Sequence, residues 1–461
     1  MATLTSLPAE VLGQIFEYLH ADRYSNFSAY SRDCAALANT CSVLAPTALS
    51  SLHTRYEAQF LQPNSGLLMH LRRYPVGYQG IRHIKINHPS CVLRATFASW
   101  TEDIVRQKWT KERRRNPDEL AKMLRKCPTF SAHHLLLDQA ANVQTLEFSA
   151  GNIDDQGSWA IKRGFSIAYL PILHGVQVLL RSPAKIASYH KLHTLRVDLG
   201  GTFTFDIERV FALPALRTLS LIKLGYTCIF DEPRAFAAKA PIAAISSVTT
   251  LQFFDCVLPC AMVYRFIQCC KALASFSWFD DVWRGQDDIL CGRVMSALEP
   301  HRNTLTSLCL RPCGLNFADQ GHRPNILVQG FESFKQLECL RVPFMLMGWL
   351  GELYAGNSAN TPVDCEQFQP LLSLLPPRLR NLTLDIDGEN SPNGIEEYLI
   401  TAVAAPLNGK TSLQSLAIPC HGLLWTGTTP MNFCKVAEAC NAMQVAFTYS
   451  MSVRICSCEL L

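Results

Sequence analysis

The chain is short of charged residues and of long apolar runs. Only 17% of its 461 residues are Asp, Glu, Lys or Arg, against about 25% in an average soluble domain, whereas 48% are hydrophobic. No uncharged apolar stretch reaches the length of about 18 residues that a membrane-spanning helix needs. The first residues contain neither a basic segment nor a continuous apolar core, so we expect no secretory signal peptide.

Motifs of the common enzyme classes are also missing. The sequence contains no GxSxG, no Walker-type phosphate loop, no GxGxxG and no HExxH. The adjacent His133 and His134 have no obvious carboxylate pattern within reach. Sequence alone leaves open a nucleophilic triad that is assembled only in space. We expect no catalytic residues, no cofactor and no enzymatic activity of the chain's own.

Cysteine, by contrast, is abundant, with 19 residues. Without a signal peptide these are expected to be thiols in a reducing compartment, which places the protein in the cytoplasm, the nucleus or both. Cys256, Cys260, Cys269 and Cys270 could be drawn as a zinc site. Structural zinc sites usually pair cysteines two to four residues apart, however, and the last two are adjacent. Thiols that act as small buried apolar groups are the simpler interpretation, so no metal is expected.

The charge that is present is unevenly distributed. Residues 70–130 contain fourteen Lys or Arg and five Asp or Glu, in a chain whose net charge is +4. The densest part is KWTKERRR, residues 108–115, inside a helix expected from about residue 100 to 125. A solvated helix face is one interpretation, and a nuclear import signal or an acidic partner is the other. The small net charge does not indicate a nucleic acid partner.

The most informative pattern is an internal repeat of the form LxxLxL. Alternation in LxL turns the fourth and sixth positions toward a core, so the copies predict strands that stack as a parallel sheet. From Leu192 to Leu413 the period averages about 32 residues. The ten copies are Ile81/Ile84/Ile86, Val143/Leu146/Phe148, Leu192/Leu195/Val197, Leu216/Leu219/Leu221, Val248/Leu251/Phe253, Leu273/Phe276/Trp278, Leu305/Leu308/Leu310, Leu337/Leu340/Val342, Leu379/Leu382/Leu384 and Leu413/Leu416/Ile418.

Two copies extend further, as VTTLQFFDCVL (248–258) and LTSLCLRPCGL (305–315). On these residues the region from about 140 to 450 resembles a leucine-rich-repeat solenoid, with Cys256 and Cys313 at the position of a buried Asn or Cys. The resemblance implies an irregular α/β solenoid with a parallel sheet on the concave side and helices and loops on the convex side. Helical spacing occurs between the expected strands, at residues 260–272, 287–299, 365–375, 395–405 and 431–443.

The N-terminal segment MATLTSLPAEVLGQIFEYLH predicts one short amphipathic helix. Pro8 suits the first helical turn, and Glu10 is favourable near the positive end of the helix dipole. Apolar residues then recur over a stripe too wide for a single contact, so one edge can pack inward while the other faces a partner. The residues of this stripe are Val11, Leu12, Ile15, Phe16 and Leu19.

LPAEVLGQIFEYL resembles the opening helix of an F-box, the helical module by which substrate receptors dock onto the Skp-type adaptor of SCF ubiquitin ligases. Residues 34–56 are similar to the second half of that module, whereas residues 21–32 are longer and more polar than its pattern. A helix that merely closes a larger domain is the alternative. The resemblance implies that the adaptor is contacted by Leu7, Pro8, Glu10, Val11, Ile15, Phe16 and Leu19.

We therefore expect an F-box module at residues 1–55, a linker and first irregular repeat with the basic helix at 56–140, and a solenoid with a C-terminal cap at 141–461. This layout is familiar in fungi and implies a substrate receptor of an SCF-type cullin-RING ubiquitin ligase. Its partners would be the Skp-type adaptor, through it the cullin, and an unknown protein target, with no nucleic acid and no membrane. An F-box scaffold without ubiquitin transfer and a repeat-only interaction module remain as alternatives.

The expected target site lies on the face of the sheet turned away from the core. Phe254 and Phe279 take the seventh position of adjacent repeats, and Arg311 and Arg341 follow in the next two. Aromatic and arginine side chains are enriched at binding hot spots. Alternatively, another segment covers the rings. On the first interpretation, replacing both arginines by Glu would abolish target capture at little cost in stability.

Overall fold

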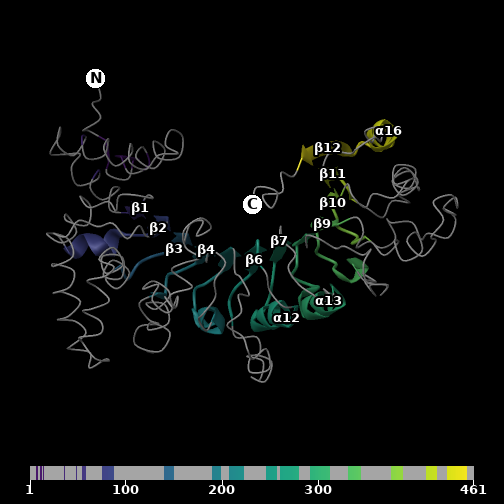
Figure 1. Ribbon diagram of the computed structural model, residues 1–461. Helices are drawn as coiled ribbons and strands as arrows, with labels where there is room; N and C mark the ends of the chain where they lie inside the picture. Colours follow the sequence, from purple (N-terminus) through teal and green to yellow (C-terminus); the bar gives the residue numbers. More distant parts are fainter. Residues whose placement is uncertain are drawn as a thin grey trace, which may run out of the picture. The chain divides into compact units, whose positions relative to one another are not determined.

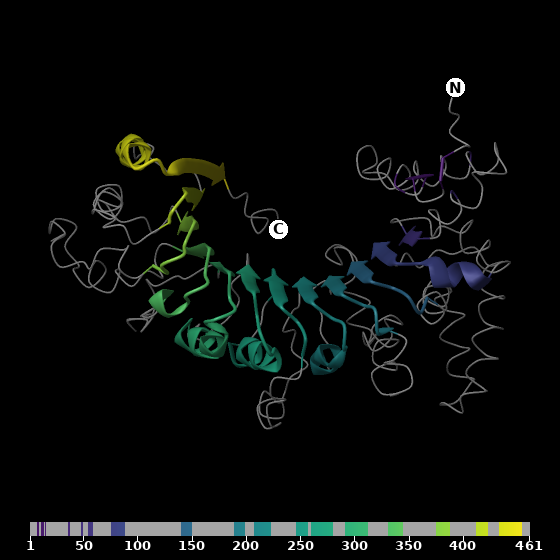
Figure 2. The same ribbon diagram turned by 180° about the vertical axis from the view of Figure 1, so that it is seen from behind.

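The structure is a computed structural model of the 461-residue chain. It describes residues 54–58, 75–87, 140–149, 189–198, 207–222, 246–256, 260–279, 291–311, 331–343, 375–387, 412–422 and 433–453, with single positions at 7, 8, 11, 12, 14, 36 and 48. The chain divides into two compact units, Met1–Leu219 and Ser220–Leu461, drawn from opposite sides in Figures 1 and 2. The helices expected at 100–125 and 395–405, and all but the last residue of the helix expected at 365–375, lie outside the described residues.

The first unit contains strands β1 (Arg55–Ala58), β2 (His83–Asn87), β3 (Thr145–Ser149) and β4 (Thr194–Asp198). Each pairs in parallel with the next, so that Ile84, Leu146 and Leu195 lie opposite one another. The 3-10 helices η2 (Pro75–Gly80) and η5 (Ile207–Ala212) precede β2 and β5 (Thr218–Ile222). Strand β5 spans the boundary between the two units.

The second unit alternates strands with short helices, and its strands β6 to β12 each pair in parallel with the next. Helices α12 and α13 lie side by side on one face of its sheet (Figure 1). We call the opposite face the outward face. The elements are β6 (Thr250–Phe254), α12 (Cys260–Cys269), β7 (Ser275–Phe279), α13 (Cys291–Leu298), η6 (Glu299–His301), β8 (Ser307–Arg311), η7 (Phe331–Ser333), β9 (Cys339–Pro343), β10 (Asn381–Asp387), β11 (Ser415–Gly422), α16 (Cys434–Ala442) and β12 (Ala446–Val453).

The repeat register read from the sequence is confirmed strand by strand. Strands β2 to β11 each begin at the third position of one LxxLxL copy. All described apolar positions of the ten copies are buried, except Leu413, which is half-buried. Equivalent residues face one another across neighbouring strands, as Leu251, Phe276 and Leu308 do. The protein is therefore an α/β protein with a parallel sheet built from repeated strand units, as in a solenoid.

Backbone hydrogen bonds join each repeat to the next in one recurring arrangement. The carbonyl of the second repeat position accepts two consecutive N–H groups from the start of the following strand segment, at 2.7 to 3.1 Å. The oxygen of Arg82, for example, accepts from the N–H groups of Gln144 and Thr145, and the oxygen of Glu338 accepts from those of Arg380 and Asn381. Because only main-chain atoms take part, the arrangement recurs whatever side chain stands at that position. The accepting carbonyls are those of Arg82, Gln144, His193, Thr249, Ala274, Thr306, Glu338 and Arg380.

Both ends of the repeat region differ from the expectation. Strand β1 begins at Arg55, where the predicted helical module ends, and pairs with β2. Residues 446–453, which the sequence placed in a cap, form β12 and pair along its whole length with β11. Gln444 makes this possible, because its left-handed φ of 59° ends α16. The N–H of Val445, the residue directly before β12, then donates to the Cys440 carbonyl at 2.9 Å and closes the end of the helix.

His301 links the last turn of α12 to the segment before β8. Its side chain is buried, its Nδ1 accepts the Leu273 N–H at 3.3 Å, and its Nε2 lies 3.4 Å from the Ile267 carbonyl. These contacts require the neutral ring with its proton on Nε2, because a protonated ring has no acceptor for the Leu273 N–H. Burial lowers the pKa of His301, against the opposite effect of its hydrogen bond to Ile267.

We therefore expect the second unit to lose stability on acidification. A lowered pKa means that the unfolded chain binds the proton more readily, so this contribution is complete above about pH 6.5 and is lost as the pH falls below it. The loss is at most about 1.4 kcal/mol for each pH unit between the unfolded and folded pKa values. Denaturant unfolding between pH 7.5 and 5 measures it. His301→Gln should flatten the pH dependence, whereas the control Thr306→Ala, at an exposed position of the same unit, should not; equal slopes in both variants would refute this role.

Candidate protein-interaction surface

The N-terminal helix begins where the sequence predicts. The Leu12 N–H donates to the Pro8 carbonyl at 3.0 Å, the first hydrogen bond of a helical turn. Leu12 is 3% exposed, whereas its neighbour Val11 is 38% exposed. Adjacent apolar residues of this helix thus face in different directions, one into the protein and one into solvent. Such an exposed apolar side chain is available for a partner.

The predicted adaptor-binding residues are only partly within the described chain. Leu7 is half-buried, and Pro8 and Val11 are exposed. Glu10, Ile15, Phe16 and Leu19 lie outside the described residues, so their contact with an adaptor stays a prediction.

On the outward face, Phe254 and Phe279 lie next to each other, as the repeat register predicts. Their rings are stacked, with centroids 5.3 Å apart and an interplanar angle of 12°. Strand β6 ends directly after Phe254 because Asp255 adopts a left-handed φ of 52°, which Asp tolerates better than most residues. The Asp255 N–H donates to the Phe279 carbonyl at 2.7 Å, and this bond holds the two strand ends together. Both rings are half-buried and reach the surface.

Arg311 continues this row, since it lies opposite Phe279 on β8. Arg341 does not occupy the same repeat position, which corrects the sequence assignment. It lies at the fifth position, opposite Cys309 and Thr383, and Pro343 takes the seventh. The side chain of Arg341 is long enough to reach the row, however, because its guanidinium carbon lies 5.4 Å from the centroid of the Phe279 ring.

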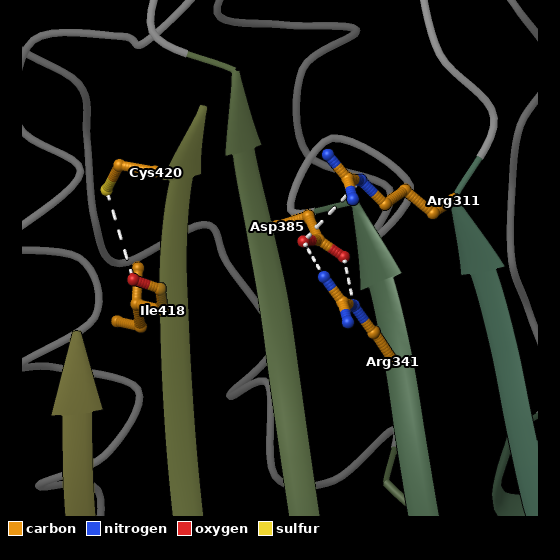
Figure 3. A network of polar contacts seen from close by, with 5 residues as sticks. All are labelled: Arg311, Arg341, Asp385, Ile418 and Cys420. Carbon is orange, nitrogen blue, oxygen red and sulfur yellow. Dashed lines mark hydrogen bonds and ion pairs between the residues drawn. The ribbon is translucent and has the colours of Figure 1, made fainter. Parts of the chain in front are cut away.

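Asp385 on β10 is the residue that sequence reasoning missed. Its carboxylate, 6% exposed, accepts two hydrogen bonds of 2.8 Å, from Nε and Nη2 of Arg341. Nε of Arg311 lies 3.8 Å from the same carboxylate (Figure 3). The hydrogen bond to Asp385 raises the pKa of Arg341. Asp385 takes the seventh position of the Leu379 copy, on the outward face, but the repeat pattern does not reveal its pairing, because Arg341 reaches it from the fifth position of its own copy.

The row covers smaller side chains that also belong to the outward face. Ser277 and Cys309 are buried there, although their register turns them away from the core. Burial raises the pKa of the Cys309 thiol to about 12, although Arg341 and Arg311 act in the opposite direction. The thiol is therefore protonated at neutral pH and is not an activated nucleophile. Because Ser277 and Cys309 are buried, a ligand would contact the row itself rather than these two side chains.

The cysteines considered for zinc serve as structural thiols where they are described. The Cys256 thiol donates to the Leu221 and Phe254 carbonyls, at 3.2 and 3.3 Å. Cys269 and Cys270 are buried, and burial, followed by the neighbouring Cys269, raises the pKa of Cys270. Within the described residues no group of three or more His, Cys, Asp or Glu is placed to hold a metal ion.

A scan of the sequence against models of known protein families finds no match, and a search of curated proteins finds none either. None of the helices in the described part of the chain has the length and apolar character needed to cross a membrane. The surface itself therefore supplies the functional argument. It combines stacked aromatic rings, two guanidinium groups and one carboxylate on neighbouring strands, and aromatic and arginine side chains are enriched at protein-binding sites.

Proposed function

We propose that the chain is a substrate receptor of an SCF-type cullin-RING ubiquitin ligase. Its F-box-like N-terminal helix would bind the Skp-type adaptor, and its leucine-rich-repeat-like sheet would hold a protein target. The observation that carries the proposal is the helix that begins at Pro8, matches the F-box pattern in sequence, and leaves Val11 exposed beside a buried Leu12. The repeated strands support the second half of the proposal, because repeat proteins commonly bind partners on an extended sheet face.

In this function the chain makes and breaks no covalent bond. It would act by proximity, holding a lysine of the target beside the ubiquitin carrier that the rest of the complex delivers. A reaction between two separately diffusing proteins then becomes effectively unimolecular, which can supply several kcal/mol of the barrier reduction.

The proposal is tested by co-purification of the chain with a Skp-type adaptor. Deletion of residues 1–55 should abolish binding. Replacing Ile15 and Phe16 together by Ala should weaken it by several kcal/mol, since buried apolar anchors contribute about 2 kcal/mol or more each. Calorimetric titration measures the affinity, and Gln14→Ala, at an exposed position of the same helix, is the matched control.

The other functions considered give different results in the same assay. Adaptor binding that is unchanged in the double variant would remove the F-box assignment and leave a repeat-only interaction module. Normal adaptor binding without ubiquitin transfer to any captured protein in a reconstituted reaction would indicate a scaffold.

A further inference from the structure

We propose that the row formed by Phe254, Phe279, Arg311, Arg341 and Asp385 binds a single carboxylate from an acidic, extended segment of the protein target. An apolar side chain next to that acidic residue would lie on the two rings. The inference rests on the proposed function for its setting, and it adds the chemistry of the target.

The charges of the row are not balanced. Arg311 and Arg341 bring two positive charges against the one negative charge of Asp385. Arg341 is fully committed to that carboxylate through two 2.8 Å bonds. Within the described residues, Arg311 is held by the 3.8 Å ion pair, which is longer than a hydrogen bond, and 17% of its side chain is exposed. The row thus presents one surplus positive charge, on a guanidinium whose fork geometry suits a second carboxylate.

The same charges favour a carboxylate over a phosphate group. One added carboxylate gives two negative charges against two positive ones. A phosphoryl group carries about −1.5 to −2 at neutral pH, so together with Asp385 it would exceed the charge of the two arginines. The buried Asp385 carboxylate, 6% exposed, would repel the excess at low effective dielectric.

The two aromatic rings of the row determine which kind of ligand residue would lie next to the acidic one. The half-buried rings of Phe254 and Phe279 stack on each other, and the Arg341 guanidinium lies over the Phe279 ring. An apolar side chain of the ligand would therefore pack against the exposed part of this stack. From β6 to β10 the row crosses five strands spaced about 4.8 Å apart, or about 19 Å. An extended peptide of about six residues covers that distance. The predicted ligand is therefore a short segment with one acidic residue next to an aliphatic or aromatic one.

The experiment is a selection of displayed random heptapeptides on the purified full-length chain, without adaptor, counter-selected on its Arg311→Gln variant. We expect enrichment of Asp or Glu beside an apolar residue. The best peptide, made with a fluorophore, should bind Arg311→Gln at least tenfold more weakly than the unaltered chain. Changing its own acidic residue to the amide should cost as much, and both changes together little more than either. Arg311→Lys, which keeps the charge but not the fork geometry, should lose part of the affinity, and less than Arg311→Gln loses.

Arg380→Gln is the matched control, because it removes the same charge from an exposed arginine that pairs with Glu338 just before β10. It should leave the affinity unchanged. The thermal midpoint of Arg311→Gln should fall only slightly, because the Arg341–Asp385 pair remains. Selected peptides without acidic residues, or insensitive to Arg311, would overturn the proposal, and so would tighter binding when phosphoserine replaces the acid. Since the assay contains no adaptor, failure of the F-box assignment would leave its result intact.

Discussion

Replacing Asp385 by Ala should lower the free energy of unfolding of the second unit by about 3 kcal/mol. Removing one partner of a buried ion pair usually costs about 3 to 5 kcal/mol, because the remaining charge is left uncompensated. The lower end applies here, since the Arg341 side chain is 31% exposed and water can solvate part of its charge. Denaturant unfolding at neutral pH measures the change.

Two further variants distinguish the loss of stability caused by the missing ion pair from the loss caused by shortening a side chain. Asp385→Asn keeps the shape and one acceptor for Arg341, so its loss should be smaller. Thr383→Ala, at a half-buried position of the same strand, should cost less than about 1 kcal/mol. Asp385→Ala with as small an effect as Thr383→Ala would mean that water replaces the carboxylate without loss.

The Arg341–Asp385 pair also revises the expected result of reversing both arginine charges. The sequence interpretation treated Arg311 and Arg341 as surface groups that could become Glu without loss of stability. Two glutamates beside Asp385 would bring three carboxylates together and remove both hydrogen bonds to Arg341. We expect that double variant to be destabilised, so it cannot serve as a clean test of target binding.

Replacing Phe253 by Ala should destabilise the second unit by about 3 to 5 kcal/mol. The ring is fully buried and packs between α12 and the sheet, with centroid distances of 5.9 Å to Phe266 and 6.0 Å to Phe276. Truncation removes its apolar burial and leaves a cavity that two large neighbouring rings cannot easily fill. Denaturant unfolding again gives the value.

Thr250→Ala is the control, because Thr250 is half-buried on the same strand and should change stability little. Leu251, in the equivalent buried row, should behave like Phe253 and cost about 2 to 5 kcal/mol as Ala. Equal effects of Thr250→Ala and Phe253→Ala would contradict the burial pattern of β6.

The sequence predicts strands β2 to β11 because each must bury two alternate apolar side chains against a core. The two end strands cannot be predicted in this way. Strand β1 reads RYEA and β12 reads AFTYSMSV, without the LxxLxL pattern. Helix ends are also missed where tertiary contacts decide them. Helix α12 stops at Cys269, before the expected residue 272, because Cys270 forms a parallel bridge with Ser246.

The sequence predicted correctly which residues of the candidate site are neighbours across the strands. It did not predict a contact that depends on how far a long side chain extends. The alternation of β6 and β7 places Phe254 beside Phe279. The Arg341–Asp385 pair joins residues 44 positions apart and requires a long side chain to cross from the fifth row to the seventh. A repeat pattern specifies the backbone position of each side chain. It does not specify which charged group the end of a long side chain will contact.

The shared carbonyl at each join has a consequence for how the chain can change over evolutionary time. Successive LxxLxL copies from Leu192 to Leu413 are 24 to 42 residues apart, yet the described joins among them use the same two N–H groups and one oxygen. Because the join needs no particular side chain, connecting segments can gain or lose residues without altering it. A whole repeat can likewise be duplicated or deleted. Each repeat donates two N–H groups to the carbonyl of the repeat before it and offers an equivalent carbonyl to the repeat after it. Loop length and repeat number are thereby free to vary while the spacing of side chains across the sheet is kept.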